Sequence, residues 1–536
     1  MRSRSTVLLA VAVLAAGTLA AMTSAQAQSG GSPHPTNSRS CAGAHMMCAE
    51  VADSEAVFGK GNYVGHDEPS VLFYSNRAGS GNSMQYRITV PTDPAGAFNP
   101  NKSYSVELGP TFWFGMALCD TQSYPEQLTK CDPDTDANIV DPAVSPKHAG
   151  TAFMELQFYP PGFIQQFTGF SCDPTRWCVA MTIDSLSQNP VTGQALNPTC
   201  TRQILGGQEY VNFAYLTKTG VPQGPPNPLQ FQFIGSGQPD PSKVLLLNQG
   251  DQATVTLHDT AQGLLAQVDD LTTGASGSMT ASAANGFGQI KFAAGAGTTQ
   301  CKEMPYDFHP MYATSSTQTR VPWTAHSYNV AFDYEIGHFD FCTRIDVNTG
   351  SCAGTEGSPG DQEPADGDDN ACFGPAQSLA LPLTGCLDTN TGFDGASYQP
   401  VWPNGDAAHH PSPVLFSSPL TGPAFSTPYD QAAFEADLPR IEAPDLGGSC
   451  NRITGAGCTI IPITDDKAPA AFYPYFSTVT SGANCRWGIG STLPGTITDF
   501  GKNAQYGDLL PLTYTNGHGT ITLFEDYRNI LNNVPC

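Results

Sequence analysis

The chain has 536 residues, of which only 13% are charged, and it contains 54 glycines and 44 prolines. Its formal net charge of −25 repels nucleic-acid phosphates and anionic lipids, so we expect neither nucleic acid nor a membrane surface as a partner. Few charges and many turn-forming residues disfavour long helices held by ion pairs and favour an all-β protein.

The N-terminal sequence predicts export. A short basic start precedes an uncharged apolar run over 6–22, and the small-residue pattern Ala-Gln-Ala follows at 25–27. This arrangement is typical of a cleaved signal peptide over 1–27, with the mature chain beginning at Gln28. No later stretch reaches the run of about twenty apolar residues that a spanning helix needs. We therefore expect a secreted, extracellular protein with no membrane span.

The cysteine pattern predicts disulfides. The chain has 16 cysteines, an even number, and none of them shows the C-x2-C spacing of zinc or thioredoxin-like sites. Even, widely spread cysteines in an exported chain form disulfides. The pairing itself stays open, and three short-range pairs are plausible: Cys41–Cys48, Cys172–Cys178 and Cys450–Cys458.

The first half of the chain is predicted to form an antiparallel β-sandwich or jelly roll. A Ser-, Gly- and Pro-rich leader over 28–40 precedes a β-sandwich domain over 41–235. Within this domain, period-two runs bounded by turn residues predict strands. These runs lie at 84–90, 153–159, 177–186, 210–216 and 229–234.

A second β-sandwich block is predicted over 236–350. Apolar residues alternate at 253–257, and a run over 264–271 leads through Thr-Thr-Gly at 272–274 into another strand at 278–284, which is a hairpin pattern. The block is either a separate domain or a continuation of the first sandwich, and the sequence leaves both open.

The last part of the chain is predicted to be loop-rich and stabilised by disulfides. Residues 351–372 form an acidic loop with almost no large apolar side chain, and residues 373–536 are rich in Pro and Gly. Only 430–438 and 522–531 in this region are predicted to be helical.

The acidic loop is a candidate calcium site. Calcium takes six to eight oxygen ligands and binds flexible, carboxylate-rich extracellular loops. The alternative is a solvated loop that aids solubility. The candidate ligands are Asp361, Glu363, Asp366, Asp368 and Asp369. A second, alternating acidic cluster follows Cys131 and contains Asp132, Asp134, Asp136 and Asn138.

Residues 333–340 are the candidate catalytic segment. If the segment is a strand, Asp333 and Glu335 lie on one face, while His338 and Asp340 lie on the other. Two carboxylates on one face of a sheet can act as the acid and the base or nucleophile of a glycosidase. The alternative is an edge strand with exposed charges.

The absent motifs and the histidines give weaker evidence about function than the carboxylate clusters do. The chain has no G-x-S-x-G, H-E-x-x-H or Walker motif, which argues against the common hydrolase and nucleotide-binding families. His66, His309, His326 and His338, with Met311, could hold copper. Ordinary structural histidines are the alternative.

Several segments resemble a group of secreted, disulfide-containing, β-rich proteins of soil bacteria and filamentous fungi whose activity is not established. The resemblance implies secretion and one integrated architecture along nearly the whole mature chain, and it carries over no catalytic residue. The segments are Gly-His-Asp-Glu-Pro at 65–69, Gln-Phe-Tyr-Pro-Pro-Gly at 157–162, Ala-Asn-Gly-Phe at 284–287, Glu-Ile-Gly-His-Phe at 335–339, Gly-Asp-Gln-Glu-Pro at 360–364 with Asp-Gly-Asp-Asp at 366–369, and Asn-Ala-Gln-Tyr-Gly at 503–507.

These observations favour a carbohydrate-active protein that binds or hydrolyses an extracellular polysaccharide. Glu335 and Asp333 would be its catalytic pair, calcium its cofactor, and aromatic residues such as Trp323 and Trp402 its sugar contacts. Two alternatives stay open: a carboxylate-dependent peptidase or other hydrolase, and a non-catalytic calcium-binding surface or matrix protein.

Overall fold

The protein is almost entirely β in the part of the chain that the structure describes, and the strands pair antiparallel. This confirms the predicted all-β, antiparallel class, while the division into sandwich or jelly-roll domains stays a prediction. The computed structural model describes residues 70–97, 104–105, 112–123, 130–138, 150–162, 172–185, 196–200, 210–230, 239–291, 301–315, 323–327, 408, 411–412, 414–438, 476–481, 484–489, 512–516, 519–523, 525–531 and 534.

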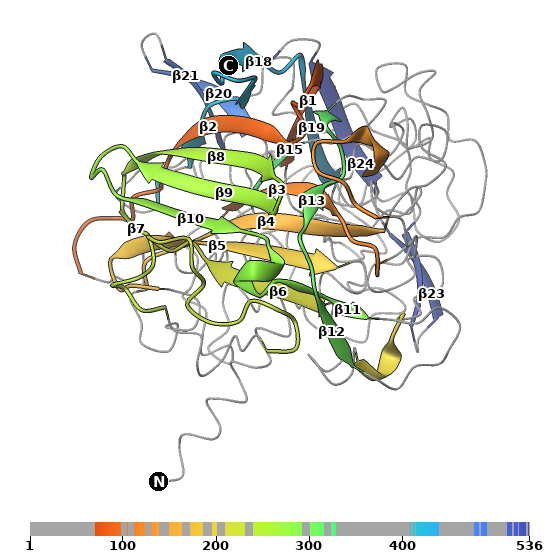
Figure 1. The fold of residues 1–536 in the computed structure, drawn as a ribbon. Coiled ribbons are helices and arrows are strands. Elements are labelled where there is room, and N and C mark those ends of the chain that lie inside the picture. The colour runs from red at the N-terminus through yellow and green to blue at the C-terminus, as the bar shows by residue number, and fades with distance from the viewer. Residues whose placement is uncertain are drawn as a thin grey trace, which may run out of the picture.

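The larger of two main sheets has eleven strands (Figure 1). Its main path runs in the order β24-β19-β1-β15-β3-β4-β5-β6, and three short strands pair beside this path. The bounds are Glu525–Leu531 (β24), Gln431–Leu438 (β19), Ser70–Ala78 (β1), Trp323–Ser327 (β15), Phe112–Cys119 (β3), Thr151–Tyr159 (β4), Arg176–Ser185 (β5) and Tyr210–Tyr215 (β6), with Leu246–Asn248 (β7), His309–Pro310 (β13) and Thr314–Ser315 (β14) at the sides.

The second main sheet has nine strands, and its path runs β10-β9-β8-β2-β16-β21-β20, with β17 and β18 beside β2. The bounds are Ser276–Thr280 (β10), Gly263–Asp270 (β9), Gln252–Thr260 (β8), Ser83–Thr89 (β2), Leu415–Phe416 (β16), Asn484–Ile489 (β21), Phe476–Ser481 (β20), Leu420–Thr421 (β17) and Thr427–Pro428 (β18). Two small hairpin-like sheets pair Gly288–Lys291 (β11) with Lys302–Pro305 (β12) and Leu512–Asn516 (β22) with Gly519–Leu523 (β23).

The hydrophobic core lies between the two main sheets. On β2, β8 and β9 every second side chain is buried, as the predicted period-two pattern requires. Phe114 of β3 bridges the sheets, because its ring centroid lies 4.6 Å from that of Tyr86 on β2 and 5.5 Å from that of Phe416 on β16. Contacts of this kind join both sheets into one buried cluster.

The two sheets are also joined along one edge. Thr217, just after β6, pairs its backbone with Ser278 of β10. The Thr217 amide donates to the Ser278 carbonyl at 3.2 Å, and the Ser278 amide donates back at 2.9 Å. This backbone pairing links the edge strand of each sheet to the other sheet. Apolar side chains of β8, β9 and β10 belong to the same buried cluster as those of β2.

The predicted hairpin over 264–284 is confirmed in its first part. β9 and β10 pair across a turn in which Gly274 has a φ of +78°, a conformation that favours glycine. β10 ends at Thr280, earlier than predicted, and a 3-10 turn at Ala283–Asn285 follows. In the predicted strand over 229–234, Leu229 lies in a turn, and 231–234 lie outside the described residues.

The two predicted C-terminal helices are wrong. Gln431–Leu438 is β19, which pairs with β1 on one side and with β24 on the other, and Gly519–Leu523 and Glu525–Leu531 are the strands β23 and β24. Alanine and glutamate favour helix only weakly, by tenths of a kcal/mol per residue. A central strand gains ladders of hydrogen bonds on both sides and buries residues such as Ala432, and this outweighs the local preference.

The predicted Cys172–Cys178 disulfide is confirmed. Two further disulfides, Cys119–Cys131 and Cys200–Cys301, join segments 12 and 101 residues apart. No cysteine within the described ranges is free. The predicted pairs Cys41–Cys48 and Cys450–Cys458 lie outside these ranges.

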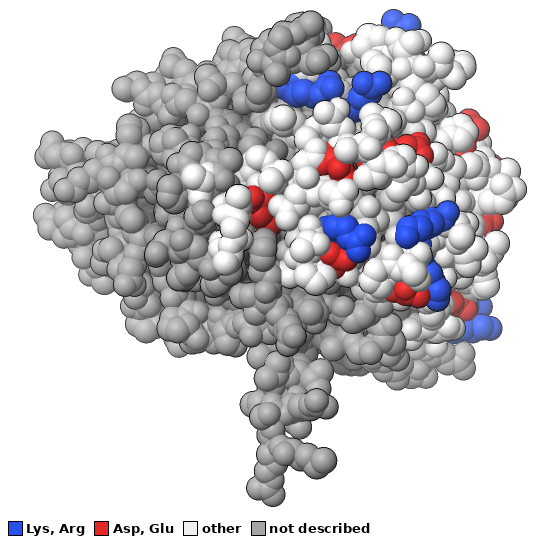
Figure 2. All heavy atoms as spheres, turned by 90° about the vertical axis from the view of Figure 1, so that its left-hand side faces the viewer, with Lys and Arg blue, Asp and Glu red and all other residues white. Residues whose placement is uncertain are grey.

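The described surface carries both signs of charge. On the face shown in Figure 2, basic and acidic side chains are interspersed rather than gathered by sign. Among the described segments we find no helix with the length and apolar character needed to cross a membrane.

Candidate functional site

The predicted catalytic and calcium-binding residues lie outside the described part of the chain. This holds for Asp333 and Glu335, for the acidic loop over 351–372 and for Trp402. Of Trp323, only the backbone is described, at the start of β15. These assignments therefore stay predictions, and the candidate site is built from the residues that the structure places.

The carboxylates of the second acidic cluster, after Cys131, contact other groups of the protein. Asp132 pairs with Lys130 at 3.2 Å, and the Asp134 carboxylate accepts a hydrogen bond from Asn82. Asp136 accepts from two backbone amides, those of residues 313 and 314, each at 3.0 Å. Asp134 and Asp136 thus hold two distant segments, while the Asp132 ion pair is local and exposed. No group of three or more His, Cys, Asp and Glu side chains in the described ranges is arranged for a metal.

The predicted copper ligands His309 and Met311 have structural partners. His309 Nδ1 lies 2.8 Å from Asp259 Oδ1, and both side chains are buried. Met311 is part of the hydrophobic core. His66 and His338 lie outside the described residues, so the copper hypothesis gains no support from those that are described.

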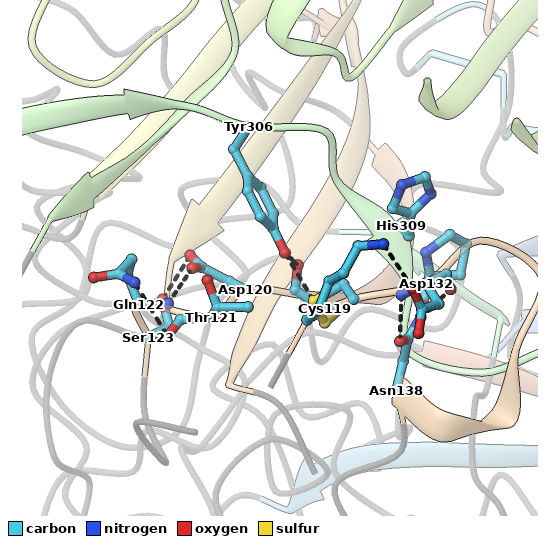
Figure 3. The surroundings of a disulfide bond; sticks show 12 residues. Cys119, Asp120, Thr121, Gln122, Ser123, Asp132, Asn138, Tyr306 and His309 are labelled. Carbon is cyan, nitrogen blue, oxygen red and sulfur yellow. Dashed lines mark hydrogen bonds and ion pairs between the residues drawn. A yellow bond between two sulfur atoms is a disulfide. The ribbon is translucent and has the colours of Figure 1, made fainter. Parts of the chain in front are cut away.

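A buried carboxylate, Asp120, joins three elements beside the Cys119–Cys131 disulfide (Figure 3). It follows β3 directly and accepts hydrogen bonds from the Gln122 amide at 2.9 Å, the Ser123 hydroxyl at 2.7 Å and Gln289 Nε2 of β11 at 2.5 Å. Burial raises the pKa of Asp120, and these hydrogen bonds oppose the rise. With its oxygens fully engaged, Asp120 is a structural link rather than a catalytic group.

Asp93 is a buried carboxyl with one engaged and one unengaged oxygen. Its Oδ1 accepts from both the Ser105 amide and the Ser105 hydroxyl at 2.7 Å. Its Oδ2 is buried and has no hydrogen-bond partner among the described residues. Burial, only partly offset by the Ser105 hydrogen bonds, raises the pKa of Asp93 from 3.8 to about 6.

We expect Asp93→Asn to remove part of the pH dependence of stability. Because the pKa is raised in the folded state, the native protein binds the Asp93 proton more tightly than the unfolded chain, so wild-type stability falls as pH rises through that window. The free energy of unfolding of the variant, relative to wild type, should therefore rise by on the order of 3 kcal/mol between about pH 4 and about pH 7. Urea unfolding at both pH values measures it, and an unchanged difference would contradict the assignment.

Strands β3, β4 and β5 differ from β8 and β9 because both of their faces are buried. On β4, Met154, Leu156 and Phe158 belong to the central core. The alternate positions, Glu155 and Gln157, therefore occupy the opposite face, and they are only 3% and 6% exposed. Polar side chains that are buried on a second face need hydrogen-bond partners, and these residues find them in one another.

We call Glu155, Gln157, Tyr159, Thr182 and Asp184 the polar row. Glu155 lies directly opposite Thr182 on β5, and Phe153 lies opposite Asp184. Directly opposite residues share a face, so the two carboxyl groups are diagonal neighbours on one surface. Such neighbours are separated by about 7–8 Å between Cα atoms.

The polar row has a defined hydrogen-bond direction. The hydroxyls of Tyr159 and Thr182 both donate to Gln157 Oε1, at 2.5 and 2.9 Å. The amide nitrogen of Gln157 then donates to Glu155 Oε2 at 2.5 Å. Since hydroxyl donors occupy the carbonyl end of the Gln157 amide, its nitrogen faces Glu155 Oε2, which acts as the acceptor.

Aromatic rings flank the polar row. Trp113 packs edge-on against Phe153 at 5.3 Å, and Tyr159 packs edge-on against Phe213 at 6.1 Å and Tyr215 at 6.2 Å. Burial first, and then nearby Tyr215, Glu155 and Asp184, raise the pKa of the Tyr159 hydroxyl well above 10.0. The hydroxyl therefore stays protonated and remains a donor at neutral pH.

The strand that carries Glu155 could be predicted from the sequence, but the site could not. The available signal was the alternation Phe-Glu-Gln-Tyr at 153, 155, 157 and 159 against Met, Leu and Phe between them. That alternation indicates a solvated outer face as readily as a buried polar one, and only the tertiary structure distinguishes the two. Comparison with protein-family models, curated proteins and solved structures finds no match to this chain.

Proposed function

We propose that this chain is a secreted, carbohydrate-active protein that binds or hydrolyses polysaccharide, with the polar row as its candidate site. The observation that carries the proposal is the diagonal placement of Glu155 and Asp184 on one face of β4 and β5. Glycoside hydrolases use two carboxyl groups about 5–9.5 Å apart, one as acid and one as base or nucleophile. Diagonal neighbours on a sheet have Cα atoms about 7–8 Å apart, so the carboxyl groups of two such side chains can reach a separation in this range.

The flanking groups support the same chemistry. Amide and hydroxyl groups such as those of Gln157 and Thr182 are suited to sugar hydroxyls, and a partly exposed aromatic ring such as that of Tyr215 to the apolar face of a sugar ring. Glu155, whose Oε2 is held as an acceptor, is the candidate base or nucleophile, and Asp184 is the candidate acid. Disulfides and the predicted signal peptide support an extracellular location.

One observation favours a second function, that of a non-catalytic surface or matrix protein. Four members of the polar row, Glu155, Gln157, Tyr159 and Thr182, are only 3–6% exposed, and hydrogen bonds join them to one another. Such a network can serve to specify the fold alone. Calcium binding by the acidic loop over 351–372 and catalysis by Glu335 with Asp333 remain predictions that are compatible with either function.

A screen of the secreted protein on plant, fungal and bacterial polysaccharides, followed by Glu155→Gln, tests the proposal. If hydrolysis is found, Glu155→Gln should lower kcat by about 10²–10⁴-fold, as expected for loss of a general base. Glu303→Gln, on β12, is the matched control and should retain kcat. Glu335→Gln, measured in parallel, separates the two candidate carboxylates.

Each outcome decides between functions. A loss of kcat in Glu155→Gln with a wild-type melting temperature supports the polar row as an active site. Glycan binding without hydrolysis supports the binding branch of the proposal. Neither binding nor hydrolysis of any polysaccharide, together with a lowered melting temperature in Glu155→Gln, would favour the structural role.

A further inference from the structure

Two arginines lie at the same level on the outer face of the nine-stranded sheet. β16 lies between β2 and β21 and pairs antiparallel with both, and one buried residue of each strand forms a row across them: Ile88, Phe416 and Trp487. Arg87 directly precedes Ile88, and Arg486 directly precedes Trp487, so both arginines point away from the core. Neighbouring strands are about 4.8 Å apart, so roughly 10 Å separates the Cα atoms of Arg87 and Arg486.

The residue between the two arginines is small. Ser417 follows β16, its amide donates to the Arg87 carbonyl at 2.8 Å, and its hydroxyl accepts from the Arg87 amide at 2.9 Å. The serine side chain is therefore held against the backbone of β2. Arg87 is exposed and Arg486 is partly exposed, and both have long, flexible stems. The two guanidinium groups can therefore both reach a small anion held above Ser417.

The two positive charges are not neutralised by the described part of the chain. Among its residues, no carboxylate forms an ion pair with Arg87 or Arg486, and Arg486 Nη1 donates to the carbonyl of the adjacent Cys485 at 3.4 Å. Asp269 lies on the same face, two strands from Arg87, but both of its oxygens accept from Gln267 Nε2 at 2.9 Å. Burial, and then the charge of Arg87, lower the pKa of Arg486, which agrees with two cations placed close together.

We propose that Arg87 and Arg486 form a binding site for a single anionic group, a carboxylate or a sulfate, carried by an otherwise neutral polysaccharide. Like charges on neighbouring strands repel each other, and an anion between them replaces this repulsion with two charge-assisted contacts. A guanidinium group presents paired N–H donors that match the oxygens of such an anion. The chain has 48 acidic and only 23 basic residues, so it repels a densely charged polymer and favours one whose charges are sparse.

The choice of a polysaccharide rests on the proposed carbohydrate function and on the side chains beside the arginine pair. Thr254 of β8 lies directly opposite Arg87, and Gln85 Nε2, on the same face of β2, donates to Thr256 Oγ1 at 3.0 Å. These hydroxyl and amide groups are partly exposed and are suited to sugar hydroxyls. The arginine pair belongs to the nine-stranded sheet and the polar row to the eleven-stranded one, so the pair would bind and select the polymer without taking part in hydrolysis.

Isothermal titration calorimetry of the full-length secreted protein tests the site with two matched pairs of polymers. Glucuronoxylan is compared with the same polymer after reduction of its carboxyl groups to alcohols, and a sparsely sulfated galactan is compared with its desulfated form. Wild type should bind the charged member of at least one pair about tenfold more tightly, and the pair that shows this preference identifies the anion. Arg87→Gln and Arg486→Gln should each weaken binding of that charged polymer by about tenfold and leave any binding of its neutral form unchanged.

The control is Arg77→Gln, which removes an exposed arginine from β1 of the other sheet and should keep wild-type affinity. An equal loss in this control, or unchanged affinity in Arg87→Gln, would overturn the proposal. Because Arg87 is exposed, its variant should keep the wild-type melting temperature, and it decides alone if Arg486→Gln does not fold.

The neutral polymers separate this proposal from the proposed function. If wild type binds neutral polysaccharides without preferring a charged form, the arginine site is wrong and the carbohydrate function stands. If it binds no polysaccharide of either kind, both are contradicted.

Discussion

Truncation of Phe114 to alanine is expected to lower the free energy of unfolding by about 3–5 kcal/mol. The ring lies between the two main sheets and contacts aromatic rings from both of them, at centroid distances of 4.6 Å to Tyr86, 5.5 Å to Phe416 and 5.9 Å to Phe158. Its removal leaves a cavity that rigid strands on both sides cannot close.

Urea unfolding followed by tryptophan fluorescence measures this loss. Leu420→Ala is the control, because Leu420 is 37% exposed on a short strand and should cost well under 2 kcal/mol. A loss below about 1 kcal/mol for Phe114→Ala would mean that the sheets do not depend on this contact.

Removal of the Cys200–Cys301 disulfide should also be strongly destabilising. The bond spans 101 residues, and in the chain-entropy description a loop of this length contributes about 4.7 kcal/mol by restricting the unfolded chain. The double variant Cys200→Ala with Cys301→Ala should therefore lose about this amount.

The Cys172–Cys178 bond provides the comparison, since it spans only 6 residues. The same relation gives about 2.2 kcal/mol for its removal. Chemical unfolding of the two double variants side by side tests the order. Equal losses, or a larger loss from the shorter loop, would show that strain or residual structure in the unfolded state dominates over loop length.

The half-exposed strands could be predicted from the sequence because their signal is local. β2 and β8 each have one buried and one solvated face, so alternate residues are apolar and the pattern is visible in a short window. The turn between β9 and β10 is also local, since Gly274 supplies the positive φ that the turn requires. The Cys172–Cys178 disulfide could be predicted for the same reason, because its two cysteines are only 6 residues apart in the sequence.

The C-terminal strands and the candidate sites could not be predicted in this way. β19 has helix-forming residues, and only its pairing with β1, more than 350 residues earlier, and with β24 makes it a strand. The polar row depends on β4 being buried on both faces, which no property of residues 151–159 reveals.

The sequence by itself therefore determined the all-β class, the positions of the half-exposed strands and the local turns, because backbone sterics and one-sided burial act over a few residues. Only the tertiary structure decided which polar side chains are buried, which carboxyl groups meet and which segments pair across long separations. The physical reason is that burial and the pairing of charges depend on what packs against a residue from elsewhere in the chain, and hydrophobic association between distant segments outweighs local preference.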